Sequence, residues 1–416
     1  MLSFLYTENY KNLKFDGKVD LKNLNIFIGP NGSGKSNLIS YLKFLNQCFI
    51  GDSNNSKKIS RFEFATSQLN RVLDIDFSPP AKVRLVYGLS QKTDSLNSLV
   101  LDLGLYITQS LGNRITNARE FLYQGTDLEE NLHNPLFYYK IHEPEIGMGF
   151  EDSDNDEIYL LKDVPNNILW LQDSLPKLTP FDVLIDNFAS DPRLDTVSSI
   201  LDWTFYNAND MNLEIIRTSE PKIGPRDTWL STTGDNLALV IDNLSQDLDF
   251  EDALNLAMKS IFPKTRRIRA VRVGRLSLTI EWHIEGNNEP FYLNEMSDGT
   301  VRMLCWAVIL HSPTLPSLLV IDEPELGLHP AWLSVLAQWI KQASEKTQII
   351  LTTHSPDLLD KFTDRLENVY CFYPTDANHY GLKPLSPEVL KPQLEEGWEL
   401  GDLYRVGDPT VGGWPW

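Results

Sequence analysis

The sequence has few cysteines and no long apolar run, and both shortages limit what the protein can be. Its three cysteines, Cys48, Cys305 and Cys371, are scattered and lack metal-ligand spacing, which favours reduced thiols in a cytoplasmic protein. No stretch approaches the ~20 uninterrupted apolar residues of a membrane span. The N-terminus has no basic segment followed by an apolar block, so a signal peptide is not expected. We therefore predict a cytoplasmic protein without membrane contact.

Positive charge is also scarce, because 37 lysines and arginines face 57 acidic residues and give a net charge of −20. Such a balance excludes a surface that coats nucleic acid indiscriminately. The exception is KTRRIRAVRVGR, Lys264–Arg275. A strand there would place Arg267, Arg269 and Arg275 on one face. Two interpretations are open: a local basic groove that contacts DNA, or a solvated edge strand guarded by charge.

The chain shows no internal repeat and no coiled-coil heptads, but its character changes twice along its length. Residues 1–126 have the pattern of two strands, a glycine-rich loop, a helix and an antiparallel meander. Residues 127–263 are rich in Asp, Asn and Pro and contain helical pieces. Residues 264–416 alternate apolar strands with helices. We expect an α/β protein in which 1–126 and 264–416 form the halves of one domain and 127–263 is inserted.

The stretch NIFIGPNGSGKSNLI carries the clearest chemical signal. Gly29, Gly34, Lys35 and Ser36 match GxxxxGK[ST], after an apolar strand and before an amphipathic helix. Backbone N–H groups freed by the glycines, together with a helix N-terminus, suit a phosphate. Lys35 would reach the β- and γ-phosphates, and the Ser36 hydroxyl would ligate Mg²⁺. We therefore expect ATP and Mg as cofactors, with ATP held by Asn31, Gly32, Ser33, Gly34, Lys35, Ser36 and Asn37.

Two further apolar strands end in polar side chains suited to hydrolysis. The strand in PSLLVIDEPELGLHP ends in Asp322 and Glu323. Asp322 would hold Mg²⁺ through water, and Glu323 would orient or deprotonate the attacking water. One helix later, the strand in TQIILTTHSPDLL ends at His354 and is expected to lie parallel to the first. His354 has either a structural role or a γ-phosphate contact through Nε2. The predicted catalytic set is Lys35, Glu323 and His354.

These segments together resemble the ATP-binding-cassette superfamily in its SMC/RecF/OLD-like branch, and more closely the AAA-family ATPases of bacterial defence and mobile-element loci. The resemblance is carried by NYKNL, GPNGSGKSN, SDGTVRML, DEPELGLHP, TTHSPDLLD, GDNLALVIDNL and LGDLYRVGDPTVGG. It is weakest between about residues 127 and 217. It implies an ABC-type P-loop head: a mixed sheet with an antiparallel β subdomain, parallel core strands and helices, and an inserted, mainly helical region.

The resemblance also implies a composite site. In this superfamily the segment SDGT serves the nucleotide of a second protomer, so Ser297 and Gly299 would bind the γ-phosphate held by a partner copy. The implied assembly is a homodimer that sandwiches ATP between its two halves. Here the segment is MSDGT instead of LSGGQ. The extra charge of Asp298 is therefore expected to point away from the phosphates.

Several other positions depart from the family pattern or have a role that is left open. Lys11 takes the place of an arginine that touches nucleotide, which would lose a bidentate contact. His329 falls where related proteins place an aspartate of the D-loop. The glutamine of the Q-loop is open between Gln68 and Gln124. The terminal Trp414 and Trp416 would either dock onto the protein or anchor a partner.

What the sequence lacks separates the candidate functions. It has no SMC-like coiled coil, and the short segment after His354 leaves no room for a Toprim nuclease domain, so we expect no intrinsic nuclease. The first hypothesis is an ATP-hydrolysing switch that senses or clamps a trigger and controls a separately encoded nuclease or toxin in antiphage defence. The alternative is a RecF-like DNA-binding protein of repair or recombination, which would use Lys264–Arg275. A third is a scaffold with a vestigial nucleotide site.

Overall fold

The chain divides into two compact units, each assembled from separate parts of the sequence. The computed structural model describes residues 1–50, 65, 81–90, 98–108, 114–129, 137–140, 145–152, 155–160, 199–224 and 226–412. Unit 1 comprises Met1–Lys22, Gly29–Trp203 and Tyr370–Pro384, and unit 2 comprises Asn23–Ile28, Thr204–Val369 and Leu385–Trp416. The predicted boundaries at 126/127 and 263/264 stay a prediction. No helix among the described residues is long and apolar enough to cross a membrane.

Unit 1 is built on a sheet in which all hydrogen-bonded neighbours of the described residues are antiparallel, in the order β2-β1-β4-β5-β6-β7-β8-β9. The predicted meander is confirmed in β4, β5 and β6. The strands are β1 (Leu2–Glu8), β2 (Val19–Asp20), β4 (Ala81–Leu89), β5 (Leu99–Thr108), β6 (Arg114–Gln124), β7 (Phe137–Lys140), β8 (Glu145–Asp152) and β9 (Asn155–Leu160).

Helix α1 (Lys35–Ile50) is fixed in unit 1 by a buried aromatic cluster. The ring of Tyr41 stacks on that of Tyr87, with centroids 4.5 Å apart. The Tyr41 hydroxyl donates to the Val86 carbonyl at 2.7 Å, which satisfies a polar group that burial would otherwise penalise. Unit 1 also holds the 3₁₀ turn η5 (Ser199–Asp202) and the antiparallel hairpin of β16 (Val369–Pro374) and β17 (Tyr380–Pro384).

Unit 2 contains a parallel sheet in the order β10-β14-β15-β3, whose strands are β10 (Thr204–Asn207), β14 (Leu318–Asp322), β15 (Gln348–Thr353) and β3 (Leu24–Ile28). Every residue of β3 and β15 is buried, as expected for strands covered on both faces. The register pairs Asn207 with Asp322, Asp322 with Thr352, and Thr353 with Ile28. The carboxyl ends of all four strands therefore lie along one edge. The predicted parallel pairing of β14 and β15 is confirmed.

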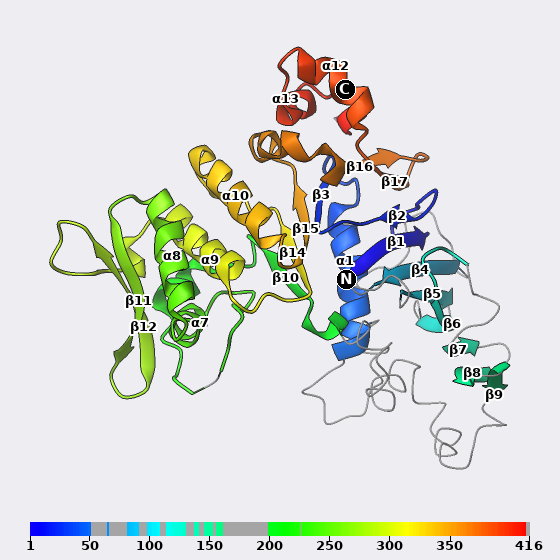
Figure 1. Cartoon of the computed structure of the whole chain (residues 1–416), viewed down its shortest axis with the longest axis horizontal. Helices are drawn as coiled ribbons and strands as arrows, with labels where there is room; N and C mark the ends of the chain where they lie inside the picture. The colour runs from blue at the N-terminus through cyan, green and yellow to red at the C-terminus, as the bar shows by residue number, and fades with distance from the viewer. Residues whose placement is uncertain are drawn as a thin grey trace. The chain divides into compact units, whose positions relative to one another are not determined.

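Helix α9 (Asp298–His311) belongs to unit 2, and most of its residues are buried. Helix α8 (Leu248–Ile261) packs between α9 and β11 (Thr265–Val273), and α7 (Leu237–Leu244) packs on β11 and on β12 (Ser277–Ile284) (Figure 1). With β13 (Phe291–Tyr292), these strands form a small antiparallel sheet in the order β11-β12-β13. The same unit includes α6 (Leu213–Thr218), η6 (Leu293–Glu295), η7 (Pro330–Trp332), α10 (Leu333–Ala343), α11 (Pro356–Leu359), η8 (Asp360–Asn368), α12 (Pro387–Glu395), α13 (Leu400–Arg405) and η9 (Pro409–Val411).

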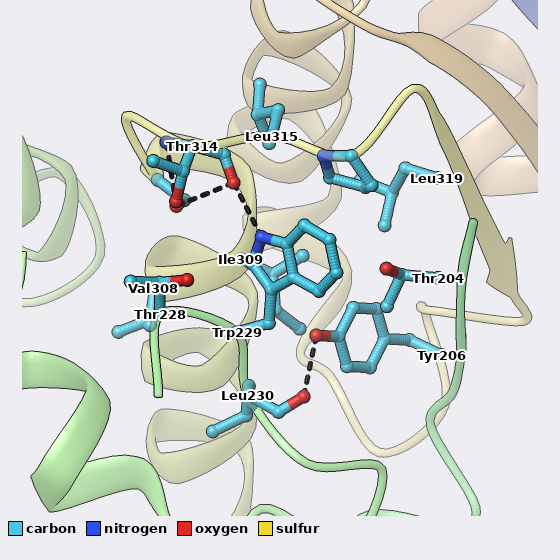
Figure 2. A pocket seen from close by; sticks show the side chains of 12 residues that line it. Thr204, Tyr206, Thr228, Trp229, Leu230, Val308, Ile309, Thr314, Leu315 and Leu319 are labelled. Atoms are coloured by element: carbon cyan, nitrogen blue, oxygen red, sulfur yellow. Dashed lines mark hydrogen bonds between the residues drawn. The ribbon is translucent and has the colours of Figure 1, made fainter. Parts of the chain in front are cut away.

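The segment before α7 is tied to the parallel sheet and to the loop after α9 by two hydrogen bonds, which Figure 2 shows. The indole N–H of Trp229 donates to the Thr314 carbonyl at 2.7 Å. The hydroxyl of Tyr206, on β10, donates to the Leu230 carbonyl at 2.7 Å. Both bonds join parts distant in sequence, so they help to set where α9 lies relative to β10.

The predicted insertion, residues 127–263, is mixed in its described part. Strands β7, β8 and β9 extend the sheet of unit 1, and α6, α7 and α8 belong to unit 2. Polar residues dominate its first half, and that composition did not indicate strands. The helices of the second half include α7, whose apolar positions at i, i+3, i+4 and i+7 the sequence showed.

Candidate functional site

The glycine loop, residues 29–36, begins directly after β3 in the chain and has a backbone that few residue types accept. Gly32 and Gly34 have φ of +83° and +112°, in the left-handed region that favours glycine. A Cβ at Gly34 would lie 2.5 Å from Cδ2 of Leu13. The Ser33 hydroxyl is buried and has no hydrogen-bond partner. A backbone cradle with an unsatisfied polar atom fits a phosphate, because a phosphate oxygen can accept that hydroxyl proton.

Lys35 and Asn12 fix the shape of the glycine loop. The buried Lys35 ammonium donates to the Gly29 carbonyl at 2.6 Å and to the Pro30 carbonyl at 3.1 Å. The Asn12 amide donates to the Gly32 carbonyl at 2.8 Å, and its oxygen accepts from Asn37 at 2.7 Å. Asn12 is a supporting residue that the sequence analysis missed. It lies in NYKNL, but no spacing rule singles it out.

Lys11 lies beside α1 and is held there by polar and aromatic contacts. Its ammonium donates to the Ser40 hydroxyl at 2.9 Å and stands 5.5 Å from the centre of the Tyr10 ring. Burial lowers the pKa of Lys11, because desolvation disfavours the charged form. Its contact with nucleotide stays a prediction.

Asp322 ends β14 with both carboxylate oxygens engaged. One oxygen accepts from the Thr352 hydroxyl and the other accepts from the Asn207 amide, the latter at 2.5 Å. These two donors, from β15 and β10, hold the carboxylate in a single orientation. A carboxylate held in this way suits a water molecule of hydrated Mg²⁺, because Mg²⁺ is usually bound through one or two carboxylates and several waters. Asn207 was not predicted, because only the strand register places it beside Asp322.

Glu323 and His354 meet at the carboxyl edge of the parallel sheet. Oε1 of Glu323 lies 2.9 Å from Nδ1 of His354, and the Glu323 backbone N–H donates to the Thr352 carbonyl at 3.0 Å. Glu323 has φ of +49°, which costs a non-glycine residue free energy. Such strain persists only where surrounding contacts enforce it, and it gathers at functional sites. The structure therefore brings two of the three predicted catalytic residues into direct contact.

A second glutamate, Glu325, is buried beneath this edge and binds the residues at the end of β15. Its Oε1 accepts from the Thr353 hydroxyl at 2.5 Å and from the His354 backbone N–H at 3.4 Å. Its Oε2 is buried and has no hydrogen-bond partner. Burial raises the pKa of the Glu325 carboxyl. Glu325 was not predicted from the sequence, because its spacing from Asp322 matches no metal-binding or catalytic pattern.

The signature turn, residues 296–300, starts α9. Ser297 caps this helix, and its hydroxyl accepts from the Thr300 backbone N–H at 3.3 Å. A Cβ at Gly299 would come within 2.9 Å of the Trp332 ring and 3.2 Å of the Gly327 carbonyl oxygen. Asp298 is 70% exposed and pairs with Arg217 at 2.6 Å. The exposed Asp298 carboxylate therefore has a cationic partner, which the sequence did not reveal.

The basic stretch Lys264–Arg275 forms β11 and the turn after it, and β11 is an edge strand of its sheet. Arg267 donates to Glu251 at 2.6 Å, and Arg269 donates to Glu281 at 2.8 Å. Pairing of these two arginines lowers the positive potential that a phosphate backbone would meet there, and β11 has the edge position that the edge-strand interpretation requires. Contact with DNA stays a prediction.

The remaining positions singled out by sequence have varied places. His329 caps η7, where its Nδ1 accepts from the Ala331 backbone N–H at 3.1 Å. Gln124 ends β6, and its Q-loop role stays a prediction. Gln68, Trp414 and Trp416 lie outside the described residues.

Comparison with known proteins places these features in a family. Residues 24–360 match the family model described as "AAA domain, putative AbiEii toxin, Type IV TA system". The match includes β3, the glycine loop, the signature turn and the strands β14 and β15. The chain belongs to this AAA-domain family.

A relative and a solved structure extend the comparison. The "Retron Vc95 probable ATPase" of Vibrio cholerae serotype O1 biovar El Tor is 22% identical over 415 residues, which cover 91% of this chain and 74% of the relative. The crystal structure of an SMC head bound to the C-terminal winged-helix domain of ScpA has a TM-score of 0.53 at 14% identity, and covers 93% of this chain and 99% of that one. The fold is therefore that of an ABC-type P-loop ATPase head, as the sequence predicted.

Proposed function

We propose that the protein is a Mg-dependent ATPase that works as a switch. The observation that carries the proposal is the contact between Glu323 and His354 at the edge where β3 leads into the glycine loop. Family membership and the likeness to a probable ATPase support it. Within unit 2, β3 and β15 are parallel neighbours, and their last residues, Ile28 and Thr353, pair with each other.

The residues present fit ATP and Mg²⁺. Lys35, backbone N–H groups of residues 31–37 and the buried Ser33 hydroxyl would hold the phosphates. Ser36, which is exposed, and Asp322 would hold the metal ion through oxygen, the donor that Mg²⁺ prefers. The ion supplies charge neutralisation for the phosphates when bound.

Glu323 would orient the attacking water and accept its proton, and His354 would hold the Glu323 carboxylate in place through Nδ1. A contact from Nε2 to a phosphate oxygen requires a proton on that nitrogen as well, because only an N–H can donate. His354 is therefore assigned to the reaction in two roles, as a positioning group for Glu323 and as a phosphate donor.

The signature turn would complete the site of a second copy. An exposed N-terminal end of a rigid, buried helix is suited to an anion, because its first N–H groups lack partners within the helix. Gly299 packs against Trp332 with no room for a side chain, which fixes the turn. We propose a head-to-tail homodimer in which ATP bound to the glycine loop of each protomer contacts Ser297 and Gly299 of the other.

The substitution Glu323→Gln tests the proposal. It keeps the shape of the side chain and removes the base, so we expect ATP hydrolysis to fall at least about a hundredfold. ATP should then accumulate on a dimer, which light scattering during gel filtration would detect. A variant that stays monomeric with ATP and Mg²⁺ would refute the dimeric switch.

We further propose that the switch controls a separately encoded effector, a nuclease or toxin, in defence against phage. The support is the retron ATPase among the relatives. Cells that carry the intact native locus should resist phage, and the Glu323→Gln locus should lose most of that protection in plating assays. Equal plating on both strains would contradict this role.

A further inference from the structure

One side chain outside all the motifs, Arg217 on α6, holds the segment that leads into the signature turn. Its Nη2 donates to Oδ1 of Asp298 at 2.6 Å and to the Met296 carbonyl at 3.0 Å, and its Nε donates to the Leu293 carbonyl at 3.3 Å. The Arg217 side chain is only 20% exposed. A guanidinium suits this task, because its planar fork presents several donors at fixed angles.

Asp298 poses an electrostatic problem for the site proposed above. As the first residue of α9, its carboxylate stabilises the helix through the favourable charge at the helix N-terminus. The same carboxylate would repel a triphosphate that approaches that terminus. Among the described residues Arg217 is the ion-pair partner found for Asp298. The pair leaves the turn close to neutral, so the N–H groups and hydroxyl of the turn can attract an anion.

We propose that Arg217 is a positioning residue of the composite nucleotide site: it cancels the charge of Asp298 and holds the turn that presents Ser297 and Gly299 to the phosphates of a second copy. The inference rests on the proposed dimer. It predicts that Arg217 matters because of Asp298, and that removing both charges restores what the loss of Arg217 alone destroys.

A double-mutant cycle in the Glu323→Gln background measures this. The dissociation constant of the ATP-bound dimer is obtained by sedimentation for the parent, for Arg217→Gln, for Asp298→Asn and for the double variant. We expect Arg217→Gln to weaken the dimer about tenfold, because it leaves an unpaired carboxylate facing the phosphates. Asp298→Asn should change the dissociation constant less than about threefold, and the double variant should return to within about threefold of the parent.

Arg405→Gln is the matched control. The Arg405 side chain is 48% exposed and pairs with Asp402, on its own helix α13, at 2.8 Å and with Asp357, on α11, at 2.9 Å. Its loss removes these surface ion pairs without touching the signature turn, so the dimer should keep its affinity. If Arg217→Gln does not fold, as judged by thermal melting, the cycle is repeated with Arg217→Met, which is also uncharged and whose weakening of the dimer Asp298→Asn should likewise remove.

The outcomes separate this inference from the proposed function. A Glu323→Gln protein that forms no ATP-dependent dimer contradicts the function itself. A parent that dimerises while Arg217→Gln dimerises equally well overturns the role of Arg217 alone. A double variant as weak as Arg217→Gln overturns the charge argument, since a purely structural arginine would not be rescued by removing its partner.

Discussion

Glu323 has a backbone φ of +49°, and two of its contacts help to hold this strained conformation. Its N–H donates to the Thr352 carbonyl, and its carboxylate lies against Nδ1 of His354. Asn9 and Lys11, in the segment NYKNL, also have positive φ, at 60° and 53°. Unfavourable backbone conformations thus occur in segments assigned to the nucleotide. A positive φ raises the free energy of the fold, and it turns the side chain in a direction that a helix or a strand does not allow.

Glu325 gives a prediction about pH at the residue scale. Burial raises its pKa in the folded protein above the ordinary value of 4.5, so the fold binds a proton that the unfolded chain releases more readily. Below pH 4.5 both states are protonated and the group costs nothing. As pH rises from 4.5 through the higher folded pKa, the group destabilises the fold increasingly.

The substitution Glu325→Gln removes this ionisation and keeps an oxygen that can accept from Thr353. We therefore expect the melting temperature of the variant, relative to the unaltered protein, to rise between pH 5 and pH 8. The check is thermal unfolding followed by circular dichroism across that range. Glu388→Gln, at an exposed site where hydrogen bonds lower the carboxyl pKa, should not show this rise. A difference independent of pH would contradict a buried, ionisable Glu325.

Helix α9 shows at the scale of elements why an apolar helix carries a polar turn. Its buried residues pack in a layer with α8, α10 and α6, and these contacts restrict the movement of the helix. At the opposite end, the bonds of Trp229 and Tyr206 secure the segments beside it. A rigid helix delivers the signature turn to a fixed place, which a phosphate contact requires.

The Tyr206 hydroxyl tests that arrangement. Tyr206→Phe keeps the buried ring and leaves the Leu230 carbonyl without its donor, so we expect a loss of about 1–2 kcal/mol in the free energy of unfolding. Chemical denaturation would measure it. Tyr373→Phe, which removes a hydroxyl bonded to exposed Asp16 in unit 1, should cost less. Equal losses in the free energy of unfolding for the two variants would contradict a particular role of the Tyr206–Leu230 bond in holding the segments beside α9.

The proposed dimer yields a prediction at the scale of the whole molecule. Lys35→Ala removes a phosphate contact, and Ser297→Ala with Gly299→Ala spoils the signature turn, so each variant alone should be inactive. In a mixture, half of the dimers pair one variant with the other. Each mixed dimer has one intact site, made from the glycine loop of one copy and the signature turn of the other.

We therefore expect mixing to restore about a quarter of the ATPase activity, if the two sites act independently. The control is a mixture of Lys35→Ala with Glu323→Gln. Both residues serve the same nucleotide from the same chain, so every site stays defective and no activity should return. Restoration in the control mixture, or none in the test mixture, would contradict a site shared in the predicted way.

Much of the fold and part of the candidate site follow from local sequence. Glycines at 32 and 34 and a following helix are dictated by spacing, because the required φ values exclude most other residues. One apolar strand ends in Asp322 and another directly precedes His354. These two segments predict a parallel sheet with polar side chains at its carboxyl edge. Strands β7 to β9 were not anticipated, because the many Asp, Asn and Glu residues of that part of the sequence interrupt the alternation of apolar and polar residues that indicates a strand.

The tertiary structure decided the partners of these residues. Asn207 reaches Asp322 only through strand pairing, Arg217 reaches Asp298 from 81 positions away, and Asn12 reaches the glycine loop from a loop before it. A sequence encodes the type and spacing of residues in one segment, which decides helix, strand and turn. Charge balance and hydrogen-bond satisfaction depend on distances between segments, and those are set only when the chain packs.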